Sequence, residues 1–460
     1  MIRGPNGESG ARLPKDADSG LIRRRIMGLA WPVVAEQALG TITHIIDMAM
    51  VGRLGATAIA AVGISLQPFM LAFALFGAVA MGTTAVVARD MGADRPRDAS
   101  NALRQSLFLA MVLAILLGVL GYLFAPGIIN LMGPEPDVLA LGVGYVRWIL
   151  PGMAFMLAAF MITGALRGAG DTMTPMKVNV VINVINPVLN YILIFGHLGF
   201  PAMGVNGAAL ATSLARGAGG IILLALVFSG RTVLTLQTAK LFHLDLNMIR
   251  RILKVGMPAA IEQSVTRLGQ LLFVRVVANL GTMAYAAHTI AINAESISYM
   301  PAFGFATAST AMVGQNLGAK NPAMAERSGW EAWKLAAVAM GVMMVVLLSI
   351  PELLMRIYTT DMEVISMGRD LLRVVAFAQI PMATFFVLAG GLRGAGDTRT
   401  MLYISAASIW LVRLTLAQVF VNVLGKGITW VWAAMVADWF VRSALAAWRF
   451  RSGRWKDIEV

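Results

Sequence analysis

Apolar residues occupy long stretches of this chain, and short polar segments separate the stretches. Each stretch can hold a helix of about 20 residues, the length that crosses a hydrocarbon core of about 30 Å. We therefore predict twelve transmembrane helices, one for each stretch. Their expected ranges are 26–50, 60–88, 103–125, 138–165, 176–196, 204–229, 252–277, 284–314, 328–350, 368–391, 400–424 and 428–448.

The two halves of the chain repeat one another at an offset of 226 positions. Residues 166–172 and 392–398 both read LRGAGDT, and Pro32 recurs as Pro258. Identical segments at a fixed offset indicate an internal duplication. The predicted fold is an all-α integral membrane protein with twelve transmembrane helices in two six-helix lobes. Because each half crosses the membrane an even number of times, a pseudo-two-fold axis along the membrane normal should relate the lobes.

These helices divide the chain into five parts. We expect a disordered cytoplasmic tail at 1–22, an N-lobe at 23–229, a cytoplasmic interlobe loop at 230–250, a C-lobe at 251–448 and a cytoplasmic tail at 449–460. The LRGAGDT segments are predicted to be tight turns, because glycine permits left-handed backbone angles and Asp-Thr can cap the next helix. They lack the Lys-Ser/Thr of a phosphate-binding loop.

Composition and charge agree with a membrane protein. The 460 residues are 58% hydrophobic and 13% charged, and the absence of cysteine excludes disulfides and thiol chemistry. The net charge of +13 is unevenly spread, with 25 Lys and Arg in the termini and alternate loops and three in the remaining loops. Basic residues collect on the cytoplasmic side. We therefore place both termini in the cytoplasm of a plasma membrane, expected to be a bacterial inner membrane, and expect no nucleic-acid partner.

One carboxylate in the predicted membrane region is not repeated. Ionisable groups at this depth are unfavourable and usually functional. Asp47 lies near the outer end of the first helix, and the offset places Phe273 at the equivalent position. Asp47 is therefore not part of the shared scaffold. Glu36, in contrast, recurs as Glu262, so we predict that this pair braces neighbouring helices.

Amides accompany this carboxylate. Four asparagines share one face of the fifth predicted helix, at spacings of 4, 3 and 4: Asn179, Asn183, Asn186 and Asn190. The offset places Val412 and Leu416 opposite the last two, so the outer part of the stripe is also asymmetric. We interpret Asn179 and Asn183 as amides that join helices within lipid.

A hydroxyl lies at a similar depth. Thr212 is about 12 Å along the sixth predicted helix, at 1.5 Å per residue. It can thus meet Asp47 and the two outer asparagines. Oxygen ligands suit a hard cation, and a buried carboxylate equally suits a proton. We predict a coupling site for Na⁺ or H⁺ and no other cofactor. Further candidate residues of a polar cavity are Glu36, Asn183, Glu262 and Glu295.

These residues resemble the pattern of the MATE family, the multidrug and toxic compound extrusion transporters. The resemblance covers about residues 22–450. Besides the two LRGAGDT turns, the matching motifs are Asp47-x-x-x-x-Gly52, Asn186-Pro187-Val188-Leu189-Asn190-Tyr191 and Gly207-Ala208-Ala209-Leu210-Ala211-Thr212. The family implies a V-shaped pair of lobes that exports organic cations in exchange for Na⁺ or H⁺. It also implies small-molecule organic substrates and contact with membrane lipid, and we expect a monomer.

The resemblance also implies a ligand set. The family's N-lobe cation site falls on Asp47, Asn186, Asn190 and Thr212, with the backbone of Ala208 as a further ligand. Some members carry acidic residues in the seventh and tenth helices. The aligned positions here are Thr266 and Met382, so the resemblance does not extend to that C-lobe site.

Three other interpretations compete with an antiporter. A lipid-linked-sugar flippase of related fold would want a strongly cationic cavity, whereas the intramembrane arginines here are scattered. An enzyme is disfavoured because the four histidines are far apart and no metal-binding or nucleophile motif is present: His44, His197, His243 and His288. A purely structural membrane protein would not need asymmetric polar clusters in duplicated halves.

Overall fold

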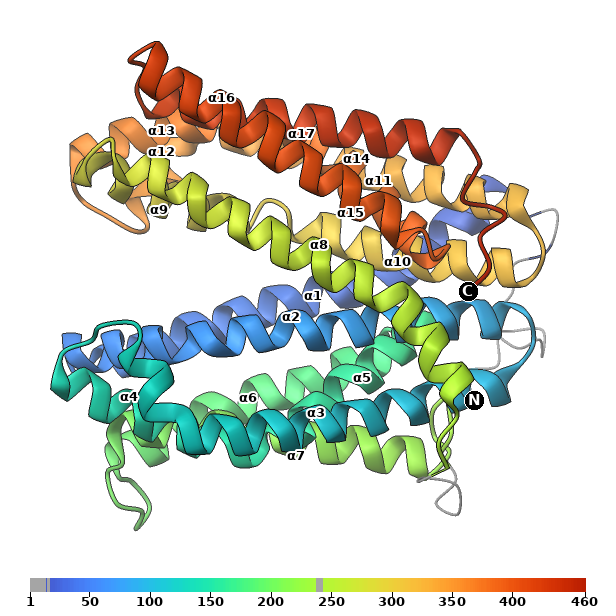
Figure 1. Cartoon of the computed structure of the whole chain (residues 1–460), viewed down its shortest axis with the longest axis horizontal. Helices are drawn as coiled ribbons and strands as arrows, with labels where there is room; N and C mark the ends of the chain where they lie inside the picture. The colour runs from blue at the N-terminus through green and yellow to red at the C-terminus, as the bar shows by residue number, and fades with distance from the viewer. Residues whose placement is uncertain (1–13, 15–16, 237–242) are drawn as a thin grey trace. The chain divides into compact units, whose positions relative to one another are not determined.

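The computed structural model describes residue 14 and residues 17–236 and 243–460, apart from the side chains of residues 70–75. Long helices dominate the described chain (Figure 1). The first half contains α1 (Ser19–Gly52), α2 (Ala56–Gly92), α3 (Pro96–Asn130), α4 (Pro136–Ile149), the 3-10 helix η1 (Leu150–Gly152), α5 (Met153–Ala169), α6 (Met173–Phe195) and α7 (Gly204–Phe228). The second half contains α8 (Leu246–Ala278), α9 (Thr282–Ser296), α10 (Met300–Gly318), α11 (Pro322–Ser349), α12 (Pro351–Arg356), α13 (Met362–Ala376), α14 (Gln379–Gly394), α15 (Thr398–Ala407), η3 (Ser408–Leu414), α16 (Thr415–Gln418), η4 (Val419–Val423) and α17 (Ile428–Arg451).

Each of the twelve predicted segments is helical, but three of them are divided into two α-helices, and a fourth, 400–424, alternates between α-helix and π-helix. The divided segments are α4–α5, α9–α10 and α13–α14, and the last pair is bent by 53°. A proline lies at or beside each break, at Pro151, Pro301 and Pro381. Proline removes a backbone donor and clashes with the preceding turn, which explains why these helices break where they do.

By length and composition, six of the described helices could cross a membrane, or seven if the bent pair α13–α14 counts as one span. Several other predicted segments are too short or too polar to count as membrane-crossing helices by length and composition. α9 and α10 are the two short parts of one segment. α1 and α8 include clusters of charged residues that lower their hydropathy.

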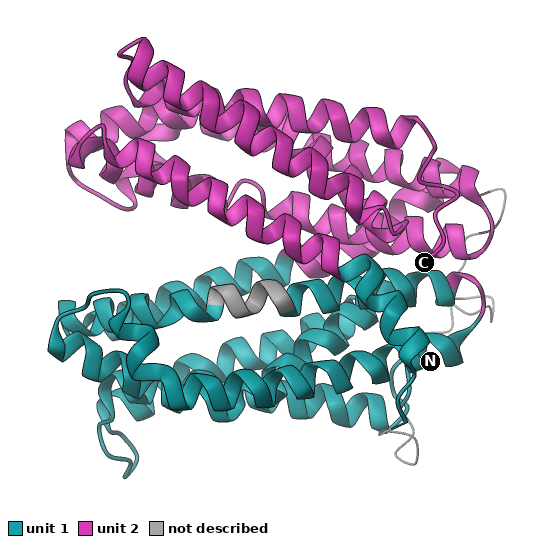
Figure 2. Cartoon of the chain, in the orientation of Figure 1, with its two compact units in different colours: residues 1–10, 35–91, 95–256 teal, residues 11–34, 92–94, 257–460 magenta. Residues whose placement is uncertain are grey.

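The described residues form two compact units (Figure 2). The first unit contains residues 35–91 and 95–256, and the second contains residues 17–34, 92–94 and 257–460. The start of α1 therefore belongs to the second unit, and the start of α8 to the first. The predicted lobes, 23–229 and 251–448, did not anticipate this exchange.

Ion pairs hold both exchanged helix starts. In the first unit, Arg251 of α8 donates to Asp90 of α2 at 3.0 and 3.2 Å, and the Asp90 carboxylate is fully buried. In the second unit, Arg23 of α1 lies 2.6 Å from the buried carboxylate of Glu331 on α11. Each repeat thus places the beginning of its first helix in the other unit.

The polar segments at the ends and middle of the chain are only partly described. α1 begins at Ser19, inside the predicted tail, and most of residues 1–22 lie outside the described residues. Residues 237–242 of the predicted interlobe loop also lie outside them. After α17 ends at Arg451, the C-terminal segment packs on the second unit, where Trp455 is fully buried.

The LRGAGDT segments form matched turns, as predicted. Gly170 follows the last residue of α5 in the left-handed region at φ +89°, and Gly396 adopts +90°. In the first turn the amide of Asp171 donates to the carbonyl of Leu166 at 2.8 Å, and the second turn repeats this distance. The Asp171 carboxylate accepts the N–H of Thr174 at 3.0 Å and so caps α6.

Small residues bring these helix ends close to their neighbours. Thr84 of α2 donates to the carbonyl of Gly164 at 2.9 Å. A Cβ on Gly168 would lie 2.4 Å from the carbonyl oxygen of Thr84, and one on Gly394 would lie 2.2 Å from that of Thr310. The glycines therefore permit helix contacts that a side chain would prevent, as in other small-residue interfaces in membranes.

A partly buried glutamate joins three helices in the first unit. Arg167, at the end of α5, lies 2.7 Å from Glu36 of α1. Asn179 of α6 donates to the same carboxylate at 2.9 Å. Asn179 therefore joins helices, as interpreted from its position in the asparagine stripe.

The second unit repeats this glutamate anchor. Arg393 lies 2.7 Å from Glu262, and Ser405 donates to it at 2.8 Å. The three contributing positions are the equivalents of those in the first unit at the 226 offset. The matched geometry agrees with a bracing role for Glu36 and Glu262.

Gly168→Ala should destabilise the first unit, because the new Cβ would overlap the backbone of Thr84. Overpacking of this kind lowers the free energy of unfolding by about 1–3 kcal/mol. Gly77→Ala on α2 is the matched control, since no described atom lies within 4 Å of the place that its Cβ would take. Thermal unfolding of the purified proteins compares them, and equal stabilities would contradict the packing argument.

Glu262→Gln should lower stability and leave the predicted cation coupling in place. The change leaves Arg393 without its charged partner, and breaking a buried ion pair costs about 3 kcal/mol. Glu36→Gln should behave alike, because its anchor is equivalent. Thermal unfolding and cation-dependent transport are measured together. A stable Glu262→Gln protein that has lost coupling would move a cation site to the second unit.

Candidate functional site

The predicted carboxylate and its two amides meet in the first unit. Asn190 of α6 donates to the Asp47 carboxylate of α1 at 2.6 Å. The amide of Asn186, with its nitrogen turned towards Asp47, donates to the two carboxylate oxygens at 2.7 and 3.0 Å. Both asparagines are buried, and the side-chain oxygen of Asn190 has no hydrogen-bond partner among the described residues. One acceptor of this cluster is thus left unsatisfied.

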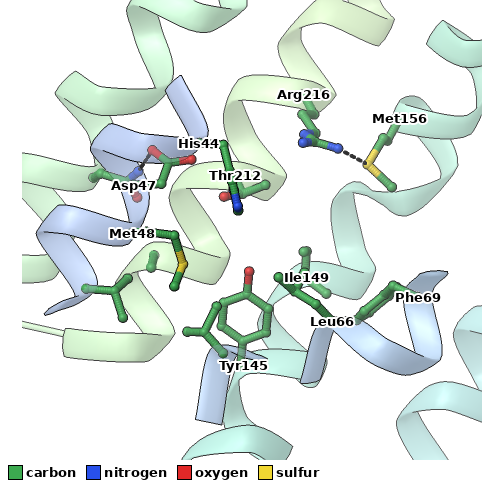
Figure 3. A pocket seen from close by; sticks show the side chains of 14 residues that line it. His44, Asp47, Met48, Leu66, Phe69, Tyr145, Ile149, Met156, Thr212 and Arg216 are labelled. Carbon is green, nitrogen blue, oxygen red and sulfur yellow. Dashed lines mark hydrogen bonds between the residues drawn. The ribbon is translucent and has the colours of Figure 1, made fainter. Parts of the chain in front are cut away.

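A pocket of about 90 Å³ opens beside this cluster. Asp47, Asn190, Ala208 and Thr212 line it, all four of which the sequence singled out. Figure 3 shows the Asp47 carboxylate and Thr212 near one another, with the hydroxyl of Tyr145 directed into the same space. Asn186 contacts Asp47 from the side of α6 and is not part of the lining.

Close helix packing explains how α6 and α7 deliver their groups to one pocket. A Cβ on Gly207 would lie 2.4 Å from the carbonyl oxygen of Leu193, so glycine is needed where the two helices approach. Ala208 and Thr212 follow Gly207 at helical spacing on α7. Asn190 precedes Leu193 by almost one turn of α6. The close approach at Gly207 thus sets the position of the candidate ligands on both helices.

Three polar residues of the pocket were not assigned to the site from sequence: His44, Tyr145 and Arg216. Arg216 lies one turn after Thr212, and its guanidinium donates to the sulfur of Met156 at 3.6 Å (Figure 3). In the sequence, Arg216 stands out only as a charged residue inside the predicted transmembrane helix 204–229. His44 lies almost one turn before Asp47 on α1, whereas Tyr145 on α4 carried no sequence signal that would link it to Asp47.

The other candidate cavity residues lie elsewhere. Glu36 and Glu262 belong to the two helix anchors, and neither lines the pocket. Asn183 is partly buried on α6 and is also outside the lining. Glu295 is buried in the second unit. The structure therefore brings together the core of the predicted site and separates it from these four residues.

The second unit has no acidic group at the two positions that the family resemblance raised. Thr266 is partly buried on α8, and Met382 is buried on α14. The expectation that this unit lacks a cation site of that type stays a prediction.

Comparisons with known proteins agree with this architecture. The family model MatE matches the chain twice, over residues 32–192 and 258–419, and the two matches begin 226 positions apart. A protein described as "Probable multidrug resistance protein NorM" from Thermotoga maritima is 35% identical, over 95% of this chain and 94% of its own length. "Uncharacterized transporter YisQ" from Bacillus subtilis is 26% identical over 94% of each chain.

Solved structures confirm the predicted fold class. "Crystal structure of MATE in complex with MaL6" superposes with a TM-score of 0.89 at 22% identity, over 97% of this chain and 100% of that one. "Outward-facing conformation of a multidrug resistance MATE family transporter of the MOP superfamily" has a TM-score of 0.87 at 22% identity, over 95% and 98% of the two chains. The family match spans most of the chain, and the similarity to the Thermotoga protein spans nearly all of it. The chain therefore belongs to the MATE family of multidrug efflux transporters.

Proposed function

We propose that this chain is a secondary antiporter that exports amphipathic, often cationic organic compounds and couples each export step to entry of Na⁺ or H⁺ at Asp47. The proposal rests mainly on one observation: the hydrogen-bond partners of the Asp47 carboxylate are the uncharged amides of Asn186 and Asn190. Neutral amides hold this carboxylate, and it makes no ion pair with a described residue, while the Arg216 guanidinium of the same pocket acts on it electrostatically without contact. A carboxylate at membrane depth that no arginine contacts directly is suited to a mobile cation.

The amides can serve Asp47 in two ways. An amide nitrogen donates to the bare carboxylate, as Asn190 does at 2.6 Å. After a half-turn the amide presents its oxygen, which is a ligand for a hard cation. In the absence of a cation, Asn186 is compatible with the carboxylate only when its nitrogen faces Asp47. A cation in the pocket would reverse that preference and add Thr212 as a further oxygen ligand.

Both cations remain candidates on chemical grounds. Na⁺ would use the carboxylate, amide and hydroxyl oxygens together with the carbonyl of Ala208. H⁺ would need the carboxylate alone, with the amides reoriented around the neutral acid. Reconstituted vesicles distinguish the two, since Na⁺ and pH gradients can be imposed separately while dye efflux is followed.

Family membership and charge distribution support the remaining parts of the proposal. We place the protein as a monomer in the bacterial inner membrane with both termini in the cytoplasm, because basic residues dominate the termini and alternate loops. Its partners are organic substrates and membrane lipid. The MatE match and the NorM relatives favour drug efflux over the lipid-linked-sugar flippase.

Asp47→Asn should abolish the effect of the coupling ion on drug binding. Linked sites typically change one another's affinity about 5- to 150-fold, and the change is reciprocal. In the wild type, the coupling ion should therefore weaken drug binding by a factor in this range, and drug should weaken ion binding equally. Titration of purified protein with and without Na⁺, and at two pH values, measures the factor. Identical ion effects in wild type and Asp47→Asn would overturn the proposal.

Asn190→Ala should weaken Na⁺ binding more than Asn179→Ala does, because it removes an amide oxygen ligand beside Asp47. If the coupling ion is H⁺, the same change should strengthen its binding, because Asn190 donates to the bare carboxylate and a hydrogen bond to a charged group contributes about 1.5–3 kcal/mol, or roughly tenfold or more in affinity. Asn179 is the control, because it bonds to the Glu36 anchor. Isothermal titration with Na⁺, or the pH dependence of transport, gives the affinities. Equal losses in both variants would favour helix joining as the role of the whole stripe.

A further inference from the structure

The second unit carries a charged cluster at the place that corresponds to the cation site. At the 226 offset, Thr212 corresponds to Asp438 on α17, and Arg216 corresponds to Arg442. Asp47 corresponds to Phe273, which is buried. The cluster therefore keeps one carboxylate, but on α17 in place of α8.

Asp438 is enclosed by fixed hydrogen-bond donors. Its side chain is fully buried, and Nε of Arg413 donates to it at 2.8 Å. Nη2 of Arg442 donates to its two oxygens at 3.1 and 3.2 Å, and the hydroxyl of Ser408 donates as well. The side chains of both arginines are almost fully buried. Unlike Asp47, this carboxylate has two built-in counter-charges.

A change of helix type explains how Arg413 reaches this place. Residues Ser408–Leu414 and Val419–Val423 are π-helical, and a π-turn accommodates one extra residue. The two MatE matches begin 226 positions apart but end 227 apart, at residues 192 and 419. With this extra residue, the equivalent of Asn186 is Arg413 and not Val412, as the offset of 226 had suggested. The offset returns to 226 in α17, because the connection between η4 and α17 is shorter than that between α6 and α7.

The contacts of Arg413 agree with that equivalence. In the first unit Asn186 contacts Asp47. In the second unit the Arg413 guanidinium lies 5.6 Å from the ring centre of Phe273, the residue equivalent to Asp47. The guanidinium thus touches the equivalents of both Asp47 and Thr212, which are the two groups that flank the pocket of the first unit.

We propose that Arg413 is a built-in cation that fills the second unit's counterpart of the coupling site, so that the transporter binds one coupling cation per chain, at Asp47. This inference rests on the proposed function. Across the equivalent positions, the first unit has Asp47 and Arg216, whereas the second has two carboxylates and two arginines, because Glu295 corresponds to Phe69 of the first pocket. The Arg413 guanidinium brings a fixed positive charge to the second unit at the place where the first unit has the neutral Asn186.

One further acidic group acts on Arg413. Glu295 is buried in the same unit and interacts electrostatically with Arg413. No hydrogen bond or ion pair joins its carboxylate to another described residue. Its negative charge adds to the attraction that holds the guanidinium in place.

The test removes Arg413 in a protein whose first site is already disabled. Asp47→Asn eliminates the first site, and Arg413→Gln is then added. Cation binding is counted per chain with radiolabelled Na⁺ and, separately, as proton uptake after a pH jump. We expect one cation in the wild type, none in Asp47→Asn and one again in the double variant. Arg442→Gln in the same background is the matched control, and it should bind none, because Arg413 still fills the site.

Three results would overturn the inference: retention of a full cation by Asp47→Asn, no added cation with Arg413→Gln, or an added cation with both arginine variants. If Arg413→Gln is unstable, its unfolding temperature should rise with Na⁺ or H⁺ concentration, since a bound cation stabilises the folded state. A variant that neither cation rescues also contradicts the inference. A wild type that binds no cation would instead refute the proposed function, and the Arg413 comparison would still report on the second unit.

Discussion

Compensation of charge within the membrane is the constraint on which this structure depends. A charge that leaves water needs a partner close by, because the surrounding medium does not stabilise it. Arginines meet this need at Glu36, Glu262 and Asp438, and each of these carboxylates is thereby committed to the architecture. Asp47 is held by amides that carry no charge. Under the proposed function, the absence of a contacting arginine is what lets Asp47 accept a mobile cation.

The two repeats contain matching copies of the glycine contacts, the glutamate anchors and the polar cluster. These copies have diverged to different extents. The glycine contacts at Gly168 and Gly394 and the two glutamate anchors keep the same geometry, because close packing and buried ion pairs tolerate little change. The polar cluster around Asp47, where α6 ends and α7 begins, has no such requirement. There the first unit has a carboxylate among amides, whereas the second has a carboxylate between arginines.

The sequence predicted the helices, the duplication and the core of the candidate site, because hydrophobic length, exact repetition and residue type are local signals. Asp47, Asn186 and Asn190 indeed meet. The π-helical register that moves Arg413 into place was not predicted, since it depends on packing around the helix. Nor was the part played by Tyr145, which reaches the pocket from α4 and shows no periodic relation to Asp47.

Because their first residues belong to the other unit, α1 and α8 are helices that both units share. Each helix is continuous across a unit boundary, which falls between Val34 and Ala35 in α1 and between Gly256 and Met257 in α8. Neither unit therefore contains the whole of its own first helix. Pro32 and Pro258 lie within two residues of these boundaries, where each removes a backbone hydrogen bond and makes bending easier. The duplicated prolines thus mark, in each repeat, the point where a single helix passes from one unit into the other.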